Sequence, residues 1–209
     1  MATASALQRS GLAAAAWLAL VSPAFAHHPM GGKMPTTALE GLLSGLGHPV
    51  IGPDHLAFII AIGIAAAIVP GGIGLIGAFL AASAAGVLAH VGAINVPMAE
   101  VLVATSVIVA GALVAFGQRA GGGLWLAVAV LAGLVHGYAF GEAIVGADRA
   151  VLGAYLAGLS AVSAVVAGAI MWLTRAFVAP DARVERHLRT AGAMVGCVGL
   201  VMLATGLVG

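Results

Sequence analysis

The sequence predicts an all-α polytopic membrane protein with six transmembrane helices that follow a cleaved signal peptide. Of the 209 residues, 62% are hydrophobic and only 7% are charged, whereas soluble domains carry about a quarter charged residues. The 31 glycines suit helices whose backbones pack closely in lipid. Six apolar segments also reach or approach the ~20 residues that a spanning helix needs. A net charge of +1 argues against a nucleic-acid partner.

Residues 1–26 have the pattern of a signal peptide. Arg9 precedes a short apolar run over residues 11–21, and Ala24-Phe25-Ala26 is a small-x-small cleavage site. The apolar run is too short to cross a hydrocarbon core of ~30 Å. We therefore expect a mature chain that begins at His27 with an external tail over residues 27–38, followed by a six-helix membrane domain over residues 39–209. An uncleaved N-terminal anchor is the alternative.

The first apolar segment is too long for one straight span and contains helix breakers. Pro49, Gly52 and Pro53 interrupt it, so we expect a short or re-entrant piece and then a helix from about Asp54. The other five segments are single spans joined by brief loops. The six expected segments are residues 39–69, 73–91, 100–117, 124–145, 151–177 and 188–208.

The distribution of positive charge predicts the orientation. With residue 27 outside, the first, third and fifth loops face the cytoplasm, and most of the arginines lie in these loops or at the adjoining helix ends. This predicts a bacterial inner-membrane protein with both mature termini in the periplasm. Trp125 and Trp172 are expected near the inner face as interfacial anchors. The inner positive residues are Arg119, Arg175, Arg183, Arg186 and Arg189, and the outer ones are Lys33 and Arg149.

Ionisable residues form two clusters inside apolar segments. His48, Asp54 and His55 lie in GLGHPVIGPDH, and His136 and Glu142 lie in GLVHGYAFGE. A charged side chain at membrane depth costs ~2.5–3.5 kcal/mol, and a bound cation would offset that cost for the acids. On the predicted topology, both clusters lie between the outer surface and the midplane of the membrane.

The two clusters share the pattern Gly-Leu-x-His-x5-acid and are separated by three spans. A 3+3 inverted repeat, as in many secondary transporters, is one interpretation. Chance similarity between two glycine-rich segments is the other.

Imidazole and carboxylate together suit borderline divalent ions such as Ni²⁺, Co²⁺, Zn²⁺ or Cu²⁺. His48, Asp54 and His55 could supply three ligands from one segment. His136 and Glu142 are six residues apart, about 240° on a regular helix. Either the neighbouring glycines distort the helix, or the two residues serve successive positions along a path. In the competing interpretation, the buried histidines only bond carbonyls and hold helices together.

Three further residues are weaker candidates. Glu100 either stabilises a helix N-terminus or lies on the ion path. His27, with its free amine, and His28 would offer nitrogen ligands to a metal outside the membrane. The alternative for these two histidines is a disordered tail left after signal cleavage.

On these residues the sequence resembles the HupE/UreJ family of hydrogenase and urease accessory nickel permeases. The matching elements are His48-x5-Asp54-His55 in the first span and His136-Gly137 followed by Glu142 in the fourth. The resemblance implies that these residues, with Glu100, carry Ni²⁺, in some cases Co²⁺. It departs at one position, because the family pattern often has a histidine where this chain has Phe140.

The sequence thus predicts a secondary carrier or facilitator that moves a divalent transition metal from the periplasm into the cytoplasm. It predicts no prosthetic group, because the metal is bound only in transit, and it leaves homo-oligomer formation open. A copper permease and a non-transporting metal-delivery subunit are the alternatives. An enzyme is disfavoured because the H-E-x-x-H motif is absent.

Overall fold

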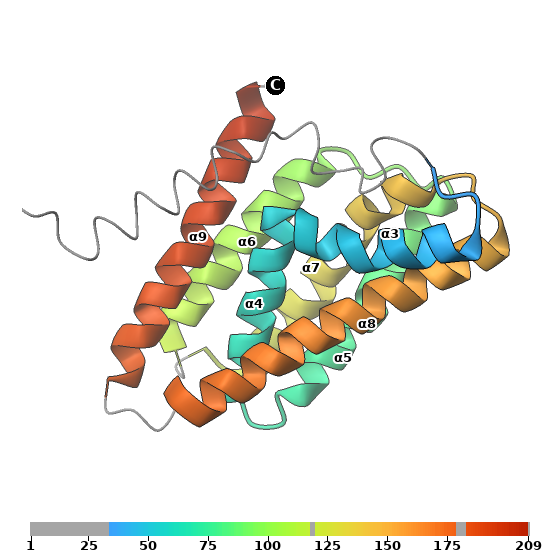
Figure 1. Ribbon diagram of the computed structural model, residues 1–209. Coiled ribbons are helices and arrows are strands. Elements are labelled where there is room, and N and C mark those ends of the chain that lie inside the picture. Colours follow the sequence, from blue (N-terminus) through green and yellow to red (C-terminus); the bar gives the residue numbers. More distant parts are fainter. Residues whose placement is uncertain (1–33, 118–119, 179–182, 209) are drawn as a thin grey trace, which may run out of the picture.

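The structure is a computed structural model that describes residues 34–117, 120–178 and 183–208. Within these ranges every regular element is helical, and the helices form one bundle (Figure 1). This confirms the predicted all-α membrane class. The expected signal peptide, His27 and His28 lie outside the described residues. The helices are α3 (Ala38–Ile51), α4 (Pro53–Ile68), α5 (Ile73–Val91), α6 (Ala99–Phe116), α7 (Gly122–Gly141), α8 (Arg149–Leu173) and α9 (Val184–Val208), with the short helices η2 (Glu142–Ile144) and η3 (Thr174–Val178).

Five of these helices, α5 to α9, are long and apolar enough to cross a membrane, and α3 with α4 makes a sixth, broken span. The span bends by 79° between its two halves. Pro53 has no N–H to bond the carbonyl of Pro49, and Gly52 between the helices has an extended backbone (φ −77°, ψ 111°). The predicted break is therefore confirmed, with α3 as a 14-residue helix that crosses the upper part of Figure 1.

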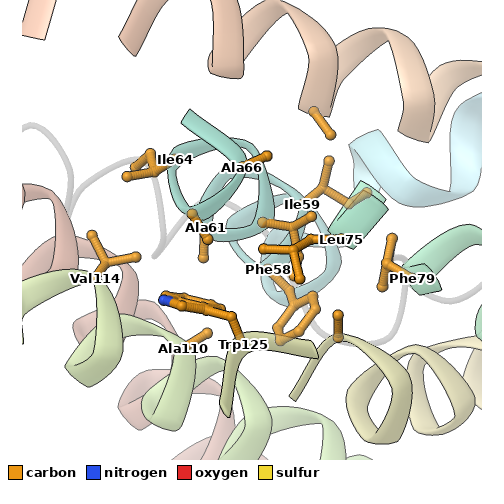
Figure 2. Close-up of a cluster of buried hydrophobic side chains, with 14 of the residues drawn as sticks. Phe58, Ile59, Ala61, Ile64, Ala66, Leu75, Phe79, Ala110, Val114 and Trp125 are labelled. Atoms are coloured by element: carbon orange, nitrogen blue, oxygen red, sulfur yellow. The ribbon is translucent and has the colours of Figure 1, made fainter. Parts of the chain in front are cut away.

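Helix α4 forms the centre of the bundle. It packs against α5, α6, α8 and α9, and a helix that is apolar on all sides is expected to be buried in this way. Figure 2 shows its side chains Phe58, Ile59 and Ala61 among residues of the surrounding helices. At 16 residues it is about 24 Å long. The break therefore places the start of a largely buried helix inside the protein.

Trp125 differs from its prediction. We expected an interfacial anchor, but its side chain is fully buried in the core around α4 (Figure 2). Its indole nitrogen has no hydrogen-bond partner among the residues that the structure describes. Trp172, in contrast, is 62% exposed. Sequence alone does not separate these two residues, because each lies near the predicted inner end of an apolar segment.

Three helix pairs make the most extensive contacts: α3 with α8, α5 with α7, and α6 with α9. Glycines permit this approach. A Cβ on Gly45 would overlap the carbonyl of Tyr155 in α8, and one on Gly137 would overlap the carbonyl of Ser83 in α5. Such small-residue contacts are the usual basis of helix packing in membranes.

The same pairing bears on the proposed repeat. An inverted repeat would relate the broken span α3–α4 to α7, α5 to α8, and α6 to α9. The contact between α3 and α8 then corresponds to the contact between α7 and α5. The contact between α6 and α9 corresponds to itself. Gly45 and Gly133 each lie three residues before the histidine of their own copy, and they pack on α8 and α5 respectively. The pairing is the one that a 3+3 inverted repeat would produce, so it supports that interpretation.

Candidate metal-binding site

Three histidines from three helices meet at the break in the first span. His48 lies in the last turn of α3, His55 in the first turn of α4 and His136 in α7. The ring centroids of His48 and His55 are 5.8 Å apart, and those of His55 and His136 are 4.9 Å apart. The Nδ1 atoms of His55 and His136 are 2.8 Å apart. None of the three side chains is more than 2% exposed.

The break itself positions His55 and Asp54. A Cβ on Gly52 would stand 2.7 Å from Cδ2 of His55 and 3.3 Å from Oδ1 of Asp54, so only glycine leaves room for both side chains. Oδ1 of Asp54 accepts the backbone N–H of His55 at 2.8 Å and lies 4.0 Å from Nδ1 of that ring. The Asp54 side chain is 9% exposed, and its place in the first turn of α4 is favoured by the helix dipole.

Two hydroxyl residues that the sequence analysis did not single out complete the cluster. Tyr155 in α8 contacts Nδ1 of His48 through Oη at 2.9 Å, and it donates a hydrogen bond to the carbonyl of Phe140 at 2.7 Å. Ser106 in α6 contacts Nε2 of His136 through Oγ at 2.9 Å. The available signal was a polar side chain inside an apolar span, but serine and tyrosine in such positions are too frequent to be diagnostic.

Phe140 lies among the three imidazoles. Its ring centroid is 4.2 Å from that of His55, 5.1 Å from that of His48 and 6.5 Å from that of His136, and its side chain is fully buried. The position at which the sequence departs from the family pattern is therefore at the centre of the candidate site.

The structure separates Glu142 from the buried histidines. Helix α7 stays regular through Gly141, and Glu142 follows it as an exposed residue of η2. Six helical residues correspond to about 9 Å along the axis, so His136 and Glu142 do not converge on one ion. The predicted distortion of the helix by its glycines is therefore not observed, and successive positions along a path stay a prediction.

Glu100 lies at a depth similar to that of Glu142. It is exposed in the first turn of α6, six residues before Ser106, and the contact between Ser106 and His136 sets α6 and α7 side by side. Glu142 follows His136 by the same six residues on the antiparallel helix. Both acids are therefore about 9 Å from the buried cluster, toward the same end of the bundle.

His90 lies in the last turn of α5, close to this level, and packs on α7. Its Nδ1 is 2.7 Å from the carbonyl oxygen of Tyr138, and its ring stacks on that tyrosine at 4.2 Å. A carbonyl only accepts, so Nδ1 donates. His90 thus joins two helices, the role that the competing interpretation gave to the buried histidines.

In the part of the chain that the structure describes, no three His, Cys, Asp or Glu side chains are arranged to hold a metal ion together. His48, Asp54, His55 and His136 are gathered in one place, where they contact one another, two hydroxyl groups and the ring of Phe140. Ion binding would therefore require these side chains to rotate.

Comparison with known proteins identifies the family. The model of the HupE / UreJ protein family matches residues 15–202, which is most of the chain. The chain belongs to the HupE/UreJ family. It is similar to the Protein HupE of Rhizobium leguminosarum bv. viciae, with 32% identity over 125 residues, or 59% of this chain and 63% of that protein. The match thus spans less than two thirds of that relative. No solved structure matches the chain.

Membership of the HupE/UreJ family confirms the predicted resemblance. The family is associated with permease or accessory functions for nickel and cobalt in hydrogenase and urease systems. It is a transporter and accessory family and not a family of enzymes.

Proposed function

We propose that the chain is a secondary carrier or facilitator that moves a divalent transition metal, Ni²⁺ or Co²⁺, from the periplasm into the cytoplasm. The observation that carries this proposal is the burial of three imidazoles and one carboxylate together at the break of the first span. An ionised Asp54 at membrane depth costs ~2.5–3.5 kcal/mol, and a bound dication would offset that cost.

The chemistry of the cluster favours borderline metals. Neutral imidazole nitrogens bind Ni²⁺, Co²⁺, Cu²⁺ and Zn²⁺, and a single carboxylate adds charge without making a hard, all-oxygen site. The only cysteine of the chain, Cys197, is exposed on α9 and does not contribute a thiolate to the cluster. The choice of Ni²⁺ and Co²⁺ over copper rests on the family association.

The two exposed acids would form the outer part of the path. Glu100 and Glu142 would attract a hydrated cation at the periplasmic end, about 9 Å from the buried histidines. The ion would then shed water and bind at His48, Asp54, His55 and His136. An inside-negative potential favours inward movement by ~2.3 kcal/mol per charge per 100 mV.

The orientation follows from the arginines. In the described ranges, Arg175, Arg183, Arg186 and Arg189 lie at the end of α8 and the start of α9, and Arg149 lies at the opposite end of the bundle. The positive-inside rule then puts the loops after α4, α6 and α8 in the cytoplasm. The break and both acids face the periplasmic half.

The test is uptake of ⁶³Ni²⁺ into proteoliposomes that contain the purified chain alone, with an inside-negative diffusion potential. We expect accumulation by the natural chain and a loss of at least tenfold in His55→Ala. His187→Ala, which removes an exposed imidazole from α9, is the matched control and should retain uptake. Competition by unlabelled Co²⁺ and Cu²⁺ would rank the metals.

Binding of Ni²⁺ without accumulation would contradict transport and favour the alternative, a non-transporting subunit that delivers metal to a partner. Uptake that His55→Ala leaves unchanged would remove the buried cluster from the path. Stronger competition by copper than by Co²⁺ would favour a copper permease.

A further inference from the structure

Each of two site histidines contacts a hydroxyl group from a helix that carries no predicted ligand of the buried cluster. The Tyr155 hydroxyl has one hydrogen, and it donates that hydrogen to the carbonyl of Phe140. It must therefore accept in its contact with His48, so Nδ1 of His48 carries the proton. The lone pair of a neutral His48 is then on Nε2.

The same reasoning applies to Ser106. Its hydroxyl donates to the carbonyl of Val103 at 2.7 Å, and therefore accepts from Nε2 of His136 at 2.9 Å. The lone pair of a neutral His136 is then on Nδ1, the atom that faces Nδ1 of His55 at 2.8 Å. Nδ1 of His55 therefore carries a proton and donates it to Nδ1 of His136.

The distance between these nitrogens suits replacement of that proton by a metal. Two nitrogens bound to one ion at about 2.1 Å stand about 3.0–3.4 Å apart. A separation of 2.8 Å is only slightly shorter, so a small rotation of the rings would admit the ion. The proton of His55 would then move to its other ring nitrogen. This step requires that the lone pair of His136 stays on Nδ1.

We propose that Ser106 and Tyr155 are positioning residues for the metal substrate: Ser106 fixes the lone pair of His136 on Nδ1, and Tyr155 fixes that of His48 on Nε2. This inference rests on the proposed function and extends it to α6 and α8. Hydrogen bonds from the second nitrogen of a ligating histidine set its tautomer and orientation, and their loss typically weakens metal binding 10–100-fold.

A purely structural role is the competing explanation, because both hydroxyls also join helices. The two roles are separable. A structural hydroxyl affects thermal stability, whereas a positioning hydroxyl affects metal affinity and the ligand field at unchanged stability. Thr105 and Tyr138 provide matched controls. Thr105 in α6 makes the same kind of bond to a carbonyl of its own helix, to Val101 at 2.7 Å, and the Tyr138 hydroxyl accepts a backbone N–H, from Val96 at 3.1 Å.

The experiment is Co²⁺ titration of the full chain in detergent, followed by the visible d–d absorption of the bound ion and by calorimetry, with the thermal midpoint of each variant. We expect Ser106→Ala and Tyr155→Phe each to weaken Co²⁺ binding about tenfold or more and to alter the spectrum. Ser106→Thr, which keeps the hydroxyl, should have the Co²⁺ affinity and the spectrum of the natural chain. Thr105→Ala and Tyr138→Phe should bind as the natural chain does.

A double-mutant cycle tests the route of the effect. Because Ser106 acts through His136, Ser106→Ala should cause no further loss in a His136→Ala background. The inference is overturned if Ser106→Ala and Tyr155→Phe bind Co²⁺ as tightly as their controls, or if their losses only follow a lowered thermal midpoint. If that occurs while the natural chain still accumulates ⁶³Ni²⁺, the proposed function stands without the inference. A natural chain that neither binds nor accumulates metal overturns both.

Discussion

Phe140 illustrates how one side chain can set the character of the candidate site. It is in contact range of His48 and His55, and it occupies the position at which the family pattern often has a histidine. An apolar ring there leaves the cluster with three imidazoles. A carrier has to release its ion as well as bind it, and weaker binding favours release. Phe140 is thus consistent with a site tuned for passage of the ion.

Substitution of Phe140 by histidine should tighten metal binding. Phe140→His would add a nitrogen next to the ring of His55, and we expect Co²⁺ affinity to rise about tenfold, which corresponds to ~1.4 kcal/mol. The rate of ⁶³Ni²⁺ uptake should fall because release becomes slower. Phe140→Leu, which removes the ring without adding a ligand, is the control. Equal affinities of the two variants would show that residue 140 does not reach the ion.

At the scale of the element, the broken span determines where the ligands lie. Pro49 and Pro53 have no backbone N–H, so neither residue can bond the carbonyl one turn earlier in the helix. The chain turns by 79° at Gly52, and this turn brings the end of α3 and the start of α4 to the same point. An unbroken helix would carry His48 and His55 about two turns apart along its axis.

Gly52→Ala should therefore weaken the metal site without unfolding the bundle. Its Cβ would stand 2.7 Å from Cδ2 of His55, so the ring would have to move, and its contact with His136 would be disturbed. We expect Co²⁺ affinity to fall about tenfold, measured by the same titration. Gly121→Ala is the matched control, because Gly121 also has an extended backbone directly before a helix, and no atom of the described residues lies within 4 Å of an added Cβ. A similar loss in both variants would contradict the steric argument.

For the whole molecule, function depends on the orientation of the bundle in the membrane. The helices alternate in direction, and the C-terminal end of α9 lies at the top of Figure 1, the same end as the α5–α6 and α7–α8 connections. The arginines at the opposite end predict that this end faces the periplasm. The buried cluster would then be loaded from outside.

Cysteine labelling tests this orientation. Single cysteines introduced by Gly146→Cys and Gly71→Cys, each in a Cys197→Ala background, would lie in loops at opposite ends of the bundle. In right-side-out spheroplasts, a membrane-impermeant maleimide should label position 146, and position 71 only after the membrane is opened. The reverse pattern would place the site on the cytoplasmic side and contradict inward loading.

The pH dependence of uptake tests imidazole ligation at the level of the whole transporter. An imidazole must be deprotonated to bind a metal, and histidine ordinarily titrates at about pH 6.5. Protonation therefore competes with metal, and uptake of ⁶³Ni²⁺ should fall from pH 7.5 to pH 5.5. The potential should be clamped and the pH kept equal on both sides. A flat profile would contradict competition between protons and the metal for the imidazoles.

Much of this architecture follows from the sequence, because the interactions that fix it are local. Apolar length determines the spans, and Pro49, Gly52 and Pro53 determine the break. The pairing of histidines with acids marks the segments that form the candidate site. These features depend on residue type and spacing, which a sequence displays directly.

Only the tertiary structure decided which of these residues meet. It brought His136 against His55 and left Glu142 exposed, and it added Ser106 and Tyr155 from helices without a recognisable motif. It also buried Trp125 in the core, where an interfacial anchor was expected. The physical reason is that side chains meet through the packing and rotation of helices, set here by close glycine contacts between segments distant in the chain. In α6 and α7 the apolar pattern is nearly uniform around the helix, so it does not reveal which face turns inward.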